Sequence, residues 1–459
     1  LSCGVCSGAV KKLQAPKKPD AAKKPSAAST SQPAAEPAKA EDPRKSLPTA
    51  RVTGRHVTVE MPVDYWKRLN NTNEFVAHID AAYEKEAEPM TPKSDVIAFR
   101  TDTLQCWGIG GGGQVIVEWN AMEEVINQFN SSNIIFGVLH EMGHCFDQPG
   151  QQRWYKFPHW LNGETWANIP LTFAAEQLYT TNQNYRIGLE WTGKRMTGRD
   201  FTDAIYLNTA DRYLNSTNHW VNIGIDELHS FHLRFTRRYG WDVYKKWYRA
   251  AYTLEGMGSF PDGGFESPER VVVNCAILSN FSGENLVPDF KRFRFPVTDE
   301  EIRKVTTKYR LSKVFAAVDQ QFTGEVEQGK ITLDPLSLRI VATNMANGAV
   351  KVSLKSIKLN GASLRYTLDG KPPTVASQLY IQPLVINRPA TIKAGIVLPV
   401  VVKAAVPASP AQRGLMKPAK TGGVVQKKPQ VLVVAELAVN PTVPAPAAAR
   451  SGAAAGATP

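Results

Sequence analysis

The sequence predicts an α+β domain with a mainly helical C-terminal half, followed by a small all-β sandwich and flanked by disordered tails. Three observations support this division. Strand and helix patterns share residues 51–331, short β-rich runs fill residues 332–402, and residues 1–50 and 403–459 are rich in Ala, Pro and Lys. The chain has 459 residues, of which 43% are hydrophobic, and this allows two or three domains.

The first 50 residues combine Lys, Pro, Ala and Ser, a composition that buries too little apolar surface to fold. We expect a disordered linker there, with folding beginning near Val52. The order Leu1-Ser2-Cys3 is similar to the end of a bacterial lipoprotein signal, one residue short of the usual pattern, so Cys3 is a candidate lipid attachment point. Cys3 and Cys6 form a C-x-x-C with no second pair, and we expect no metal site there.

Most of the positive charge lies outside the predicted folded part. The formal net charge is +12, of which residues 1–50 contribute +5 and residues 403–459 contribute +6. The residues between them carry only +1. A nucleic-acid groove is therefore not expected.

The first part of the predicted domain mixes strands and helices. Residues 57–61 alternate like a strand, and residues 65–83 have the period of a helix. Residues 95–99 and 115–119 are further predicted strands. Four glycines at 110–113 precede the last strand; a phosphate loop should open a helix, but β-branched residues follow at once, so we interpret the run as a flexible hairpin.

Residues 133–150 read NIIFGVLHEMGHCFDQPG and contain an H-E-x-x-H motif. The apolar residues before the motif predict a buried helix, which a Pro-Gly pair then ends. Residues four apart share one face of a helix, so His140 and His144 can bind one metal ion while Glu141 reaches a water beside it. The alternative is a helix whose two histidines bind no metal.

A catalytic zinc site needs a third protein ligand and keeps a fourth position open for water. Glu164 follows His144 by 20 residues, which leaves room for a loop and a second helix. Asn168 lies on the same face of that helix and could orient a ligand by a hydrogen bond. Pro170 is expected to bend or break the helix after its first turns.

Two other carboxylates remain alternatives for the third ligand. Asp147 would give a tighter H-E-x-x-H-x-x-D arrangement, and Glu176 would need a longer excursion of the chain. We favour Glu164 over both.

Residues 168–299 are mainly helical in pattern, with an amphipathic helix at 226–237 and another helix at 241–252. Four histidines in or near this part could donate to the oxyanion of a tetrahedral intermediate, although each could equally be a packed or surface residue. They are His159, His219, His229 and His232.

Cys106, Cys145 and Cys275 belong to the predicted folded part. A disulfide among the three would form in an oxidising compartment, but the sequence does not choose the pair. Cys145 adjoins His144, yet a fourth protein ligand would close the water position, so we do not count it as a ligand.

Residues 363–394 read SLRYTLDGKPPTVASQLYIQPLVINRPATIKA, with Asp369-Gly370 as a turn signal between strands. The stretch is similar to the small β-sandwich at the C-terminus of chitobiase and hexosaminidase-type secreted enzymes. The match is carried by RYTLDG at 365–370, a Pro-Thr pair, Tyr380 and TIKA at 391–394. The resemblance implies an accessory immunoglobulin-like module, for which carbohydrate binding and a spacer role both remain open.

The chain after residue 403 is rich in Ala, Pro and Val, and we expect disorder. No apolar run in the sequence reaches the roughly 20 residues that a membrane helix needs. Residues 431–439 are too few and are interrupted by Glu436.

H-E-M-G-H, followed about twenty residues later by Glu and four residues beyond it by Asn, resembles the glutamate-zincin (gluzincin) pattern. With NGETWANI at 162–169, the motif resembles the enhancin-like peptidases of family M60, which include bacterial mucin-degrading metalloproteases. The similarity continues through RYGW at 238–241 and SNFSGENLVPDFKRFRFPVT at 279–298, and covers roughly residues 52–311.

This resemblance implies a zincin-like zinc metallopeptidase domain in which His140, His144 and Glu164 hold Zn²⁺ and Glu141 is the general base. It implies glycoprotein substrates, with mucin-type O-glycans recognised next to the cut. Zinc peptidases of this kind also bind the substrate backbone along an edge strand beside the motif helix, and we expect residues 114–118 to form that strand.

We therefore predict a secreted zinc-dependent endopeptidase that hydrolyses peptide bonds in mucin-type O-glycoproteins with a metal-activated water. A periplasmic or cell-surface location, with the N-terminal region as a lipid anchor, fits the same prediction. The alternative is a catalytically inactive glycan-binding or adhesion protein on the cell surface. A third hypothesis is a structural surface protein whose tails link a spacer module to the envelope.

Overall fold

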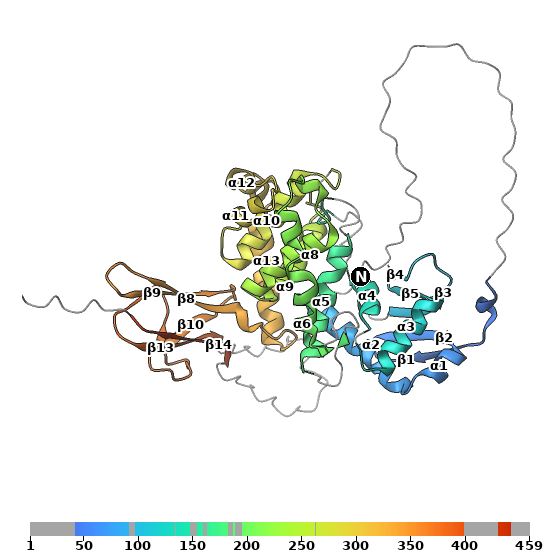
Figure 1. Cartoon of the computed structure of the whole chain (residues 1–459). Helices are drawn as coiled ribbons and strands as arrows, with labels where there is room; N and C mark the ends of the chain where they lie inside the picture. The colour runs from blue at the N-terminus through green and yellow to red at the C-terminus, as the bar shows by residue number, and fades with distance from the viewer. Residues whose placement is uncertain are drawn as a thin grey trace, which may run out of the picture. The chain divides into compact units, whose positions relative to one another are not determined.

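A computed structural model describes residues 42–90, 97–133, 135–146, 154–158, 163–181, 187–188, 195–261, 263–398 and 430–441 (Figure 1). They belong to two compact units. The first unit falls within Leu1–Gln148 and Gly163–Asn208, and the second within Pro149–Asn162 and Thr209–Pro459.

The first unit is built on a five-stranded sheet of order β1-β2-β3-β5-β4. Its strands are β1 (Thr49–Thr53), β2 (Val57–Pro62), β3 (Ile97–Asp102), β4 (Gly108–Gly111) and β5 (Gln114–Glu118). The pairs β2–β3 and β3–β5 are parallel, and the pairs β1–β2 and β4–β5 are antiparallel. Alternate residues of β2 and β5 are buried, as the alternating sequence predicts.

The helices of this unit are α1 (Val63–Arg68), α2 (Thr72–Ala87), α3 (Trp119–Asn130), α4 (Phe136–Phe146), α5 (Gly163–Thr181) and α6 (Gly198–Thr202), with a π-helical turn at Asp203–Leu207 and two short strands, β6 (Ile187–Gly188) and β7 (Arg195–Met196). The single helix expected over residues 65–83 is wrong. The chain forms two helices there, because Asn71 caps α2 with its side chain, which accepts a hydrogen bond from the Glu74 backbone N–H at 3.1 Å.

Three other expectations about this unit have clear outcomes. The hairpin at the glycine run is confirmed: β4 and β5 are joined through Gly112 and Gly113, whose positive φ values of 60° and 78° suit a two-residue hairpin loop. The expectation that residues 114–118 form an edge strand is wrong, because the hairpin places β4 outside β5. The expectation that folding begins near Val52 is wrong, because a 3₁₀ turn at Pro43–Ser46 and the start of β1 at Thr49 precede this residue.

Pro170 does not break the second helix of the site. Helix α5 runs without interruption from Gly163 to Thr181 with this proline inside it. A proline in a helix interior costs about 3 kcal/mol. The residues on either side of it, Ile169 and Leu171, are buried, and we attribute the continuity of α5 to this packing.

The second unit contains the helices α7 (Ala210–Leu214), α8 (Ile225–Tyr239), α9 (Asp242–Gly256), α10 (Pro268–Ser282), α11 (Val287–Arg292), α12 (Asp299–Lys308) and α13 (Leu311–Glu327), with 3₁₀ turns at Trp220–Asn222 and Pro335–Ser337. The helices α8 and α9 confirm the two helices predicted at 226–237 and 241–252. No helix in the described part of the chain is long and apolar enough to span a bilayer.

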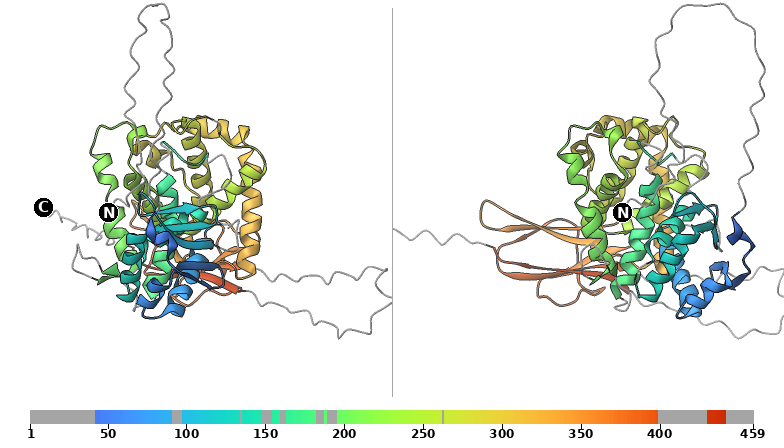
Figure 2. Two further views of the ribbon diagram at one scale, coloured as in Figure 1. Left: turned by 90° about the vertical axis from the view of Figure 1, so that its right-hand side faces the viewer. Right: turned by 45° about the vertical axis from the view of Figure 1, so that its right-hand side comes forward.

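A β-sandwich follows the helices (Figure 2). One sheet has the order β11-β10-β13-β14 and the other β12-β9-β8. The strands are β8 (Leu338–Asn344), β9 (Val350–Ser356), β10 (Ser363–Thr367), β11 (Gln378–Leu379), β12 (Leu384–Ile386), β13 (Ala390–Leu398) and β14 (Gln430–Val439). Apolar side chains from both sheets, such as Leu354 and Ile396, share one buried cluster with Phe322 of α13, and this confirms the predicted fold class.

The expectation of disorder throughout residues 403–459 is wrong for β14. This strand pairs antiparallel with β13 along its length, from Ala390 opposite Val439 to Leu398 opposite Gln430. Val433 and Val439 are buried in the sandwich core. The apolar run that was too short for a membrane helix serves as a sheet strand. The expectation of disorder is also wrong for residues 42–50, which include the 3₁₀ turn and the start of β1, whereas residues 1–41, 403–429 and 442–459 lie outside the described residues, and Cys3 with them.

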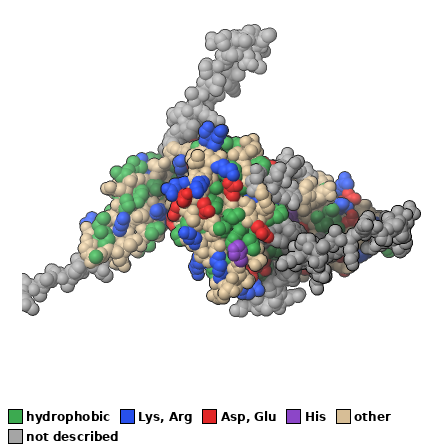
Figure 3. Space-filling view, turned by 90° about the horizontal axis from the view of Figure 1, so that it is seen from above, with side chains coloured by type: hydrophobic (Ala, Val, Ile, Leu, Met, Phe, Trp, Pro, Cys, Tyr) green, Lys and Arg blue, Asp and Glu red, His purple; other side chains and the backbone are tan. Residues whose placement is uncertain are grey.

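On the face drawn in Figure 3, Lys and Arg side chains are interspersed with Asp and Glu. Ion pairs also join the two kinds of side chain: Arg238 lies 2.7 Å from Glu284 and 3.3 Å from Asp289. This mixture agrees with the low net charge of the residues between the two tails.

Candidate metal centre

Helix α4 carries the H-E-x-x-H motif and meets α5 at very short range. The Cβ of an alanine at position 143 would lie 2.3 Å from the backbone oxygen of Ala167 on α5, so only glycine permits this approach. The face of α4 that carries His140 and His144 is thereby brought against the first turns of α5, where Glu164 and Asn168 lie.

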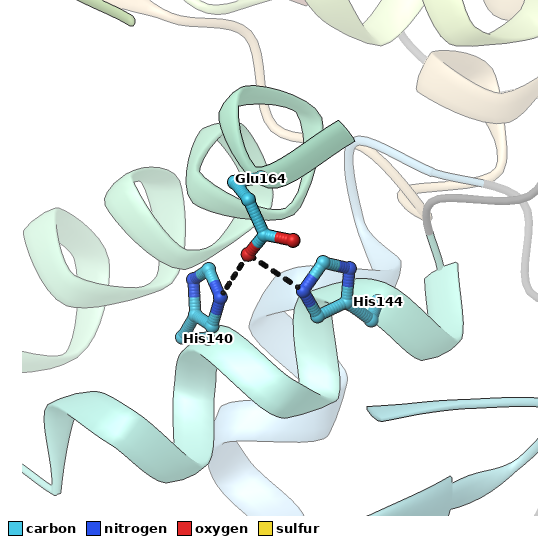
Figure 4. A group of neighbouring side chains, drawn as sticks. All are labelled: His140, His144 and Glu164. Carbon is cyan, nitrogen blue, oxygen red and sulfur yellow. Dashed lines mark hydrogen bonds and ion pairs between the residues drawn. The ribbon is translucent and has the colours of Figure 1, made fainter. Parts of the chain in front are cut away.

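His140, His144 and Glu164 converge (Figure 4). Oε2 of Glu164 lies 2.9 Å from Nε2 of His140 and 3.2 Å from Nε2 of His144. One ligand atom from each of the three side chains lies within 4.8 Å of the others. Ligand atoms about 2.0 Å from a tetrahedral zinc ion are about 3.3 Å apart. The donor types and their spacing therefore fit a metal ion such as zinc.

Asn168 makes the contact predicted for it. Its side-chain oxygen lies 2.7 Å from Nδ1 of His140, and both groups are buried. An amide oxygen accepts the Nδ1 proton, which leaves Nε2 as the ring atom that faces Glu164 and is available to a metal ion.

The charges of the three groups are coupled. Burial lowers the pKa of His140, but the hydrogen bond to Glu164 and the negative charges of Glu141 and Glu164 outweigh it, so the pKa is raised. Burial raises the pKa of Glu164, but the hydrogen bonds to His140 and His144 outweigh it and lower the pKa well below the ordinary value. Glu164 is therefore an anion at neutral pH, as a metal ligand must be.

Glu141 is buried on a different face of α4, beside the edge strand β4. Burial raises the pKa of its carboxyl above the ordinary value, more than the positive charges of His140 and His144 and a hydrogen bond from the Gly110 backbone lower it. An added Cβ at Gly108 of this strand would lie 3.1 Å from Oε1 of Glu141. The edge strand beside the motif helix, expected at residues 114–118, is therefore β4.

The other candidate ligands do not belong to this group. Asp147 lies outside the described residues. Glu176 is buried on α5, where its Oε1 accepts a hydrogen bond from the Thr202 hydroxyl at 3.3 Å. The group that could hold a metal among the described residues contains His140, His144 and Glu164 without Glu176.

The histidines considered as oxyanion donors lie elsewhere in the chain. His229 and His232 are buried on α8, and His219 caps the 3₁₀ turn at Trp220–Asn222. All three belong to the second unit, and their role stays a prediction. His159 lies outside the described residues.

No disulfide joins Cys106, Cys145 and Cys275. Cys145 and Cys275 are free thiols. Cys106 is disulfide-bonded, but its partner is neither of these two residues. The Cys145 thiol donates to the backbone oxygen of Gln114 at 3.3 Å, and burial raises its pKa to about 12. A thiol held in this way keeps its proton at neutral pH, which agrees with leaving it out of the ligand set.

Comparison with known proteins gives one family match. Residues 341–399 match the model of the chitobiase/beta-hexosaminidase C-terminal domain, the module expected from the RYTLDG stretch. No curated protein is significantly similar to the chain in sequence.

Several solved structures are similar to this chain. A functionally unknown conserved protein from Bacillus anthracis str. Ames has a TM-score of 0.43 and 14% identity, covering 76% of this chain and 69% of its own. The catalytic module of the metalloprotease ZmpA from Clostridium perfringens has a TM-score of 0.35 and 12% identity, covering 76% and 65%. The M60 catalytic domain of Clostridium perfringens ZmpC, in complex with the sialyl T antigen, has a TM-score of 0.36 and 14% identity, covering 76% and 67%. At TM-scores below 0.5, these likenesses do not establish an activity for this chain.

Proposed function

We propose that the protein is a zinc-dependent endopeptidase that acts on glycoproteins. The observation that carries the proposal is the convergence of His140, His144 and Glu164, with Asn168 behind His140 and Glu141 one residue along the same helix. Two imidazoles and one carboxylate form the ligand set of a catalytic zinc site, in which a fourth position stays open.

The division of work among the side chains follows from their chemistry. A zinc ion bound by the three ligands would polarise the scissile carbonyl and lower the pKa of an attacking water towards about 7. Glu141 accepts the proton of that water and delivers it to the leaving amine, which a neutral side chain in its place could not do. Asn168 holds His140 in the tautomer that presents Nε2.

The edge strand β4 offers a site for the substrate backbone. The Glu118 N–H donates to the Trp107 oxygen at 2.9 Å, so Trp107 and Glu118 form a hydrogen-bonded pair. Pairs alternate along an antiparallel ladder, and Gly108 and Gly110 therefore direct their backbone groups away from β5. An extended peptide that pairs with this edge would lie next to Glu141.

The substrate class rests on the sequence resemblance to enhancin-like peptidases, carried by HEMGH and NGETWANI. That resemblance also supports a secreted or cell-surface location and the choice of zinc. For the β-sandwich we propose a structural role rather than sugar binding. Its only aromatic side chains in the described strands and loops, Tyr366 and Tyr380, are partly buried against the core cluster, so neither ring offers a fully open face on which a sugar could stack.

Cleavage of an O-glycosylated mucin fragment tests the proposal, with Glu141→Gln and an enzymatically deglycosylated fragment in parallel. We expect the native protein to contain one zinc ion and to cut the glycosylated fragment, and Glu141→Gln to keep the zinc and lose at least about 100-fold in rate. Cleavage of both fragments would remove the glycan requirement. Zinc-free protein that binds the fragment without cutting it would favour the glycan-binding alternative.

A further inference from the structure

One face of α4 faces the β4–β5 hairpin at three successive turns. The residues on it are Gly137, Glu141 and Cys145, four apart and therefore aligned along the helix. The Cβ of an alanine at position 137 would lie 2.2 Å from the indole ring of Trp107, and the thiol of Cys145 bonds to the Gln114 oxygen. The hairpin thus lies along the stripe that has Glu141 at its middle.

Two glycines of β4 lie over Glu141, and a side chain added at each would meet a different part of it. A Cβ at position 110 would lie 1.8 Å from the backbone oxygen of Glu141, so Gly110 is needed for the strand to approach the helix at all. A Cβ at position 108 would lie 3.0 Å from Cγ, 3.1 Å from Oε1 and 3.2 Å from Cδ of the Glu141 side chain. Gly108 therefore borders the carboxylate itself and not the helix backbone.

The backbone at position 108 does not explain a glycine there. Gly108 has no positive φ, unlike Gly111, Gly112 and Gly113 of the same hairpin. It sits in a regular strand, where glycine is disfavoured because it loses more conformational freedom and packs no side chain. The space that its missing side chain leaves is occupied by the Glu141 carboxylate.

The strand has two further anchors besides the hydrogen bond from the Gly110 backbone to the Glu141 carboxyl. The Trp107 indole N–H donates to Glu124 of α3 at 3.0 Å, and the Trp107 oxygen accepts from the Glu118 backbone. A side chain added at position 108 is therefore more readily accommodated by movement of the Glu141 side chain than by movement of β4.

We propose that Gly108 is a positioning residue for the general base: its lack of a side chain keeps the Glu141 carboxylate in the orientation that accepts a proton from the attacking water. This proposal rests on the proposed peptidase function. A displacement of about 1 Å in a reacting group can cost about 100-fold in rate, and contacts of 3.0 to 3.2 Å require a shift of some tenths of an ångström. We therefore expect Gly108→Ala to lower kcat by about 3- to 10-fold.

The test compares Gly108→Ala with Gly110→Ala and with the control Gly264→Ala, whose added Cβ meets nothing within 4 Å. We expect Gly108→Ala to keep the zinc content, the Tm and the KM of the native protein while kcat falls. Gly110→Ala should lose thermal stability, because its clash is with backbone, and Gly264→Ala should change none of these quantities. In a Glu141→Asp background, where the carboxyl group is drawn back from β4 by one methylene, Gly108→Ala should lower kcat by less than about 3-fold.

Crystal structures of the native protein and of Gly108→Ala give a readout that does not need activity. We expect the Glu141 carboxylate to be displaced or to adopt another rotamer, with His140 and His144 in place. An unmoved carboxylate, an unchanged kcat, an equal loss of rate in the Glu141→Asp background, or a loss of zinc or of folding would each overturn the proposal. If the native protein cuts nothing, the peptidase function fails, and the two crystal structures still decide whether Gly108 positions Glu141.

Discussion

Glu86 is expected to destabilise the first unit at neutral pH, because its carboxyl group is fully buried. It lies on α2 with 0% exposure, and neither oxygen of its carboxyl group has a hydrogen-bond partner in the described part of the chain. Burial raises the pKa of Glu86 well above the ordinary value of 4.5. The folded protein therefore keeps a proton that the unfolded chain releases.

The sign and size of the effect follow from proton linkage. Because the folded pKa lies above the unfolded one, the stability contributed by this group is complete below pH 4.5 and is lost as the pH rises towards the folded pKa. The loss is about 1.4 kcal/mol per pH unit, so a carboxyl that stays protonated in the folded protein costs about 2 to 3 kcal/mol between pH 5 and pH 7. Glu86→Gln keeps the size of the side chain and removes the proton equilibrium.

Unfolding in urea, followed by circular dichroism at pH 5 and pH 7, measures this cost. We expect the advantage of Glu86→Gln over the native protein to be larger at pH 7 than at pH 5 by about 2 to 3 kcal/mol, or roughly 5–10 °C in Tm. Glu84→Gln, on an exposed side chain of the same helix, is the control and should show no such gain. A pH dependence that is the same in Glu86→Gln and in the native protein would refute the reasoning.

Three further substitutions have defined outcomes. Asn168→Ala should weaken zinc binding by about 10- to 100-fold in chelator competition, because it removes the hydrogen bond that orients a histidine ligand; unchanged affinity would contradict that role. Gly143→Ala should lower both the zinc affinity and the Tm, because its Cβ would push the Ala167 backbone away; a variant with native values would mean that α5 can move at no cost. Lys246→Ala should lower the free energy of unfolding by about 3 kcal/mol, because the buried Asp319 carboxylate loses the buried cation 2.8 Å away and keeps only the exposed Lys358, 3.3 Å from its other oxygen; a loss below about 1 kcal/mol would show that Lys358 and water replace Lys246.

The grouping of the candidate metal ligands could be predicted because two of them are local in sequence. His140 and His144 are one helical turn apart, and any helix at this place puts their side chains on one face. Glu164 needed only a loop and a second helix, and the candidate orienting residue, Asn168, lies one turn beyond it. The candidate ligands thus need only one pair of helices, α4 and α5, and the apolar residues before the motif already indicate the first of them.

Contacts between distant backbones could not be predicted. A glycine run indicates freedom of the chain but not which helix will approach it, so the place of Gly108 over Glu141 was out of reach. Strand β14 was missed for a similar reason: a run of apolar residues between Ala- and Pro-rich stretches indicates a strand only when its partner, β13, is known. Pro170 shows the reverse, a local preference that tertiary packing overrides.

Helix α4 carries the candidate metal ligands on one face and the proposed general base on another, so substitutions can test the two parts of the site separately. The face with His140 and His144 depends on α5, so substitutions between these helices should change metal affinity. The face with Glu141 depends on β4, so substitutions there should change the rate of a metal-loaded protein. Both faces contact their neighbours through glycines, Gly143 on the one side and Gly108 and Gly110 on the other. The three alanine variants should therefore lower different quantities: the zinc affinity and the Tm for Gly143→Ala, the thermal stability for Gly110→Ala, and kcat for Gly108→Ala. If all three variants lost zinc, the two faces of α4 would depend on each other, and β4 would not support the proposed general base independently of the metal ligands.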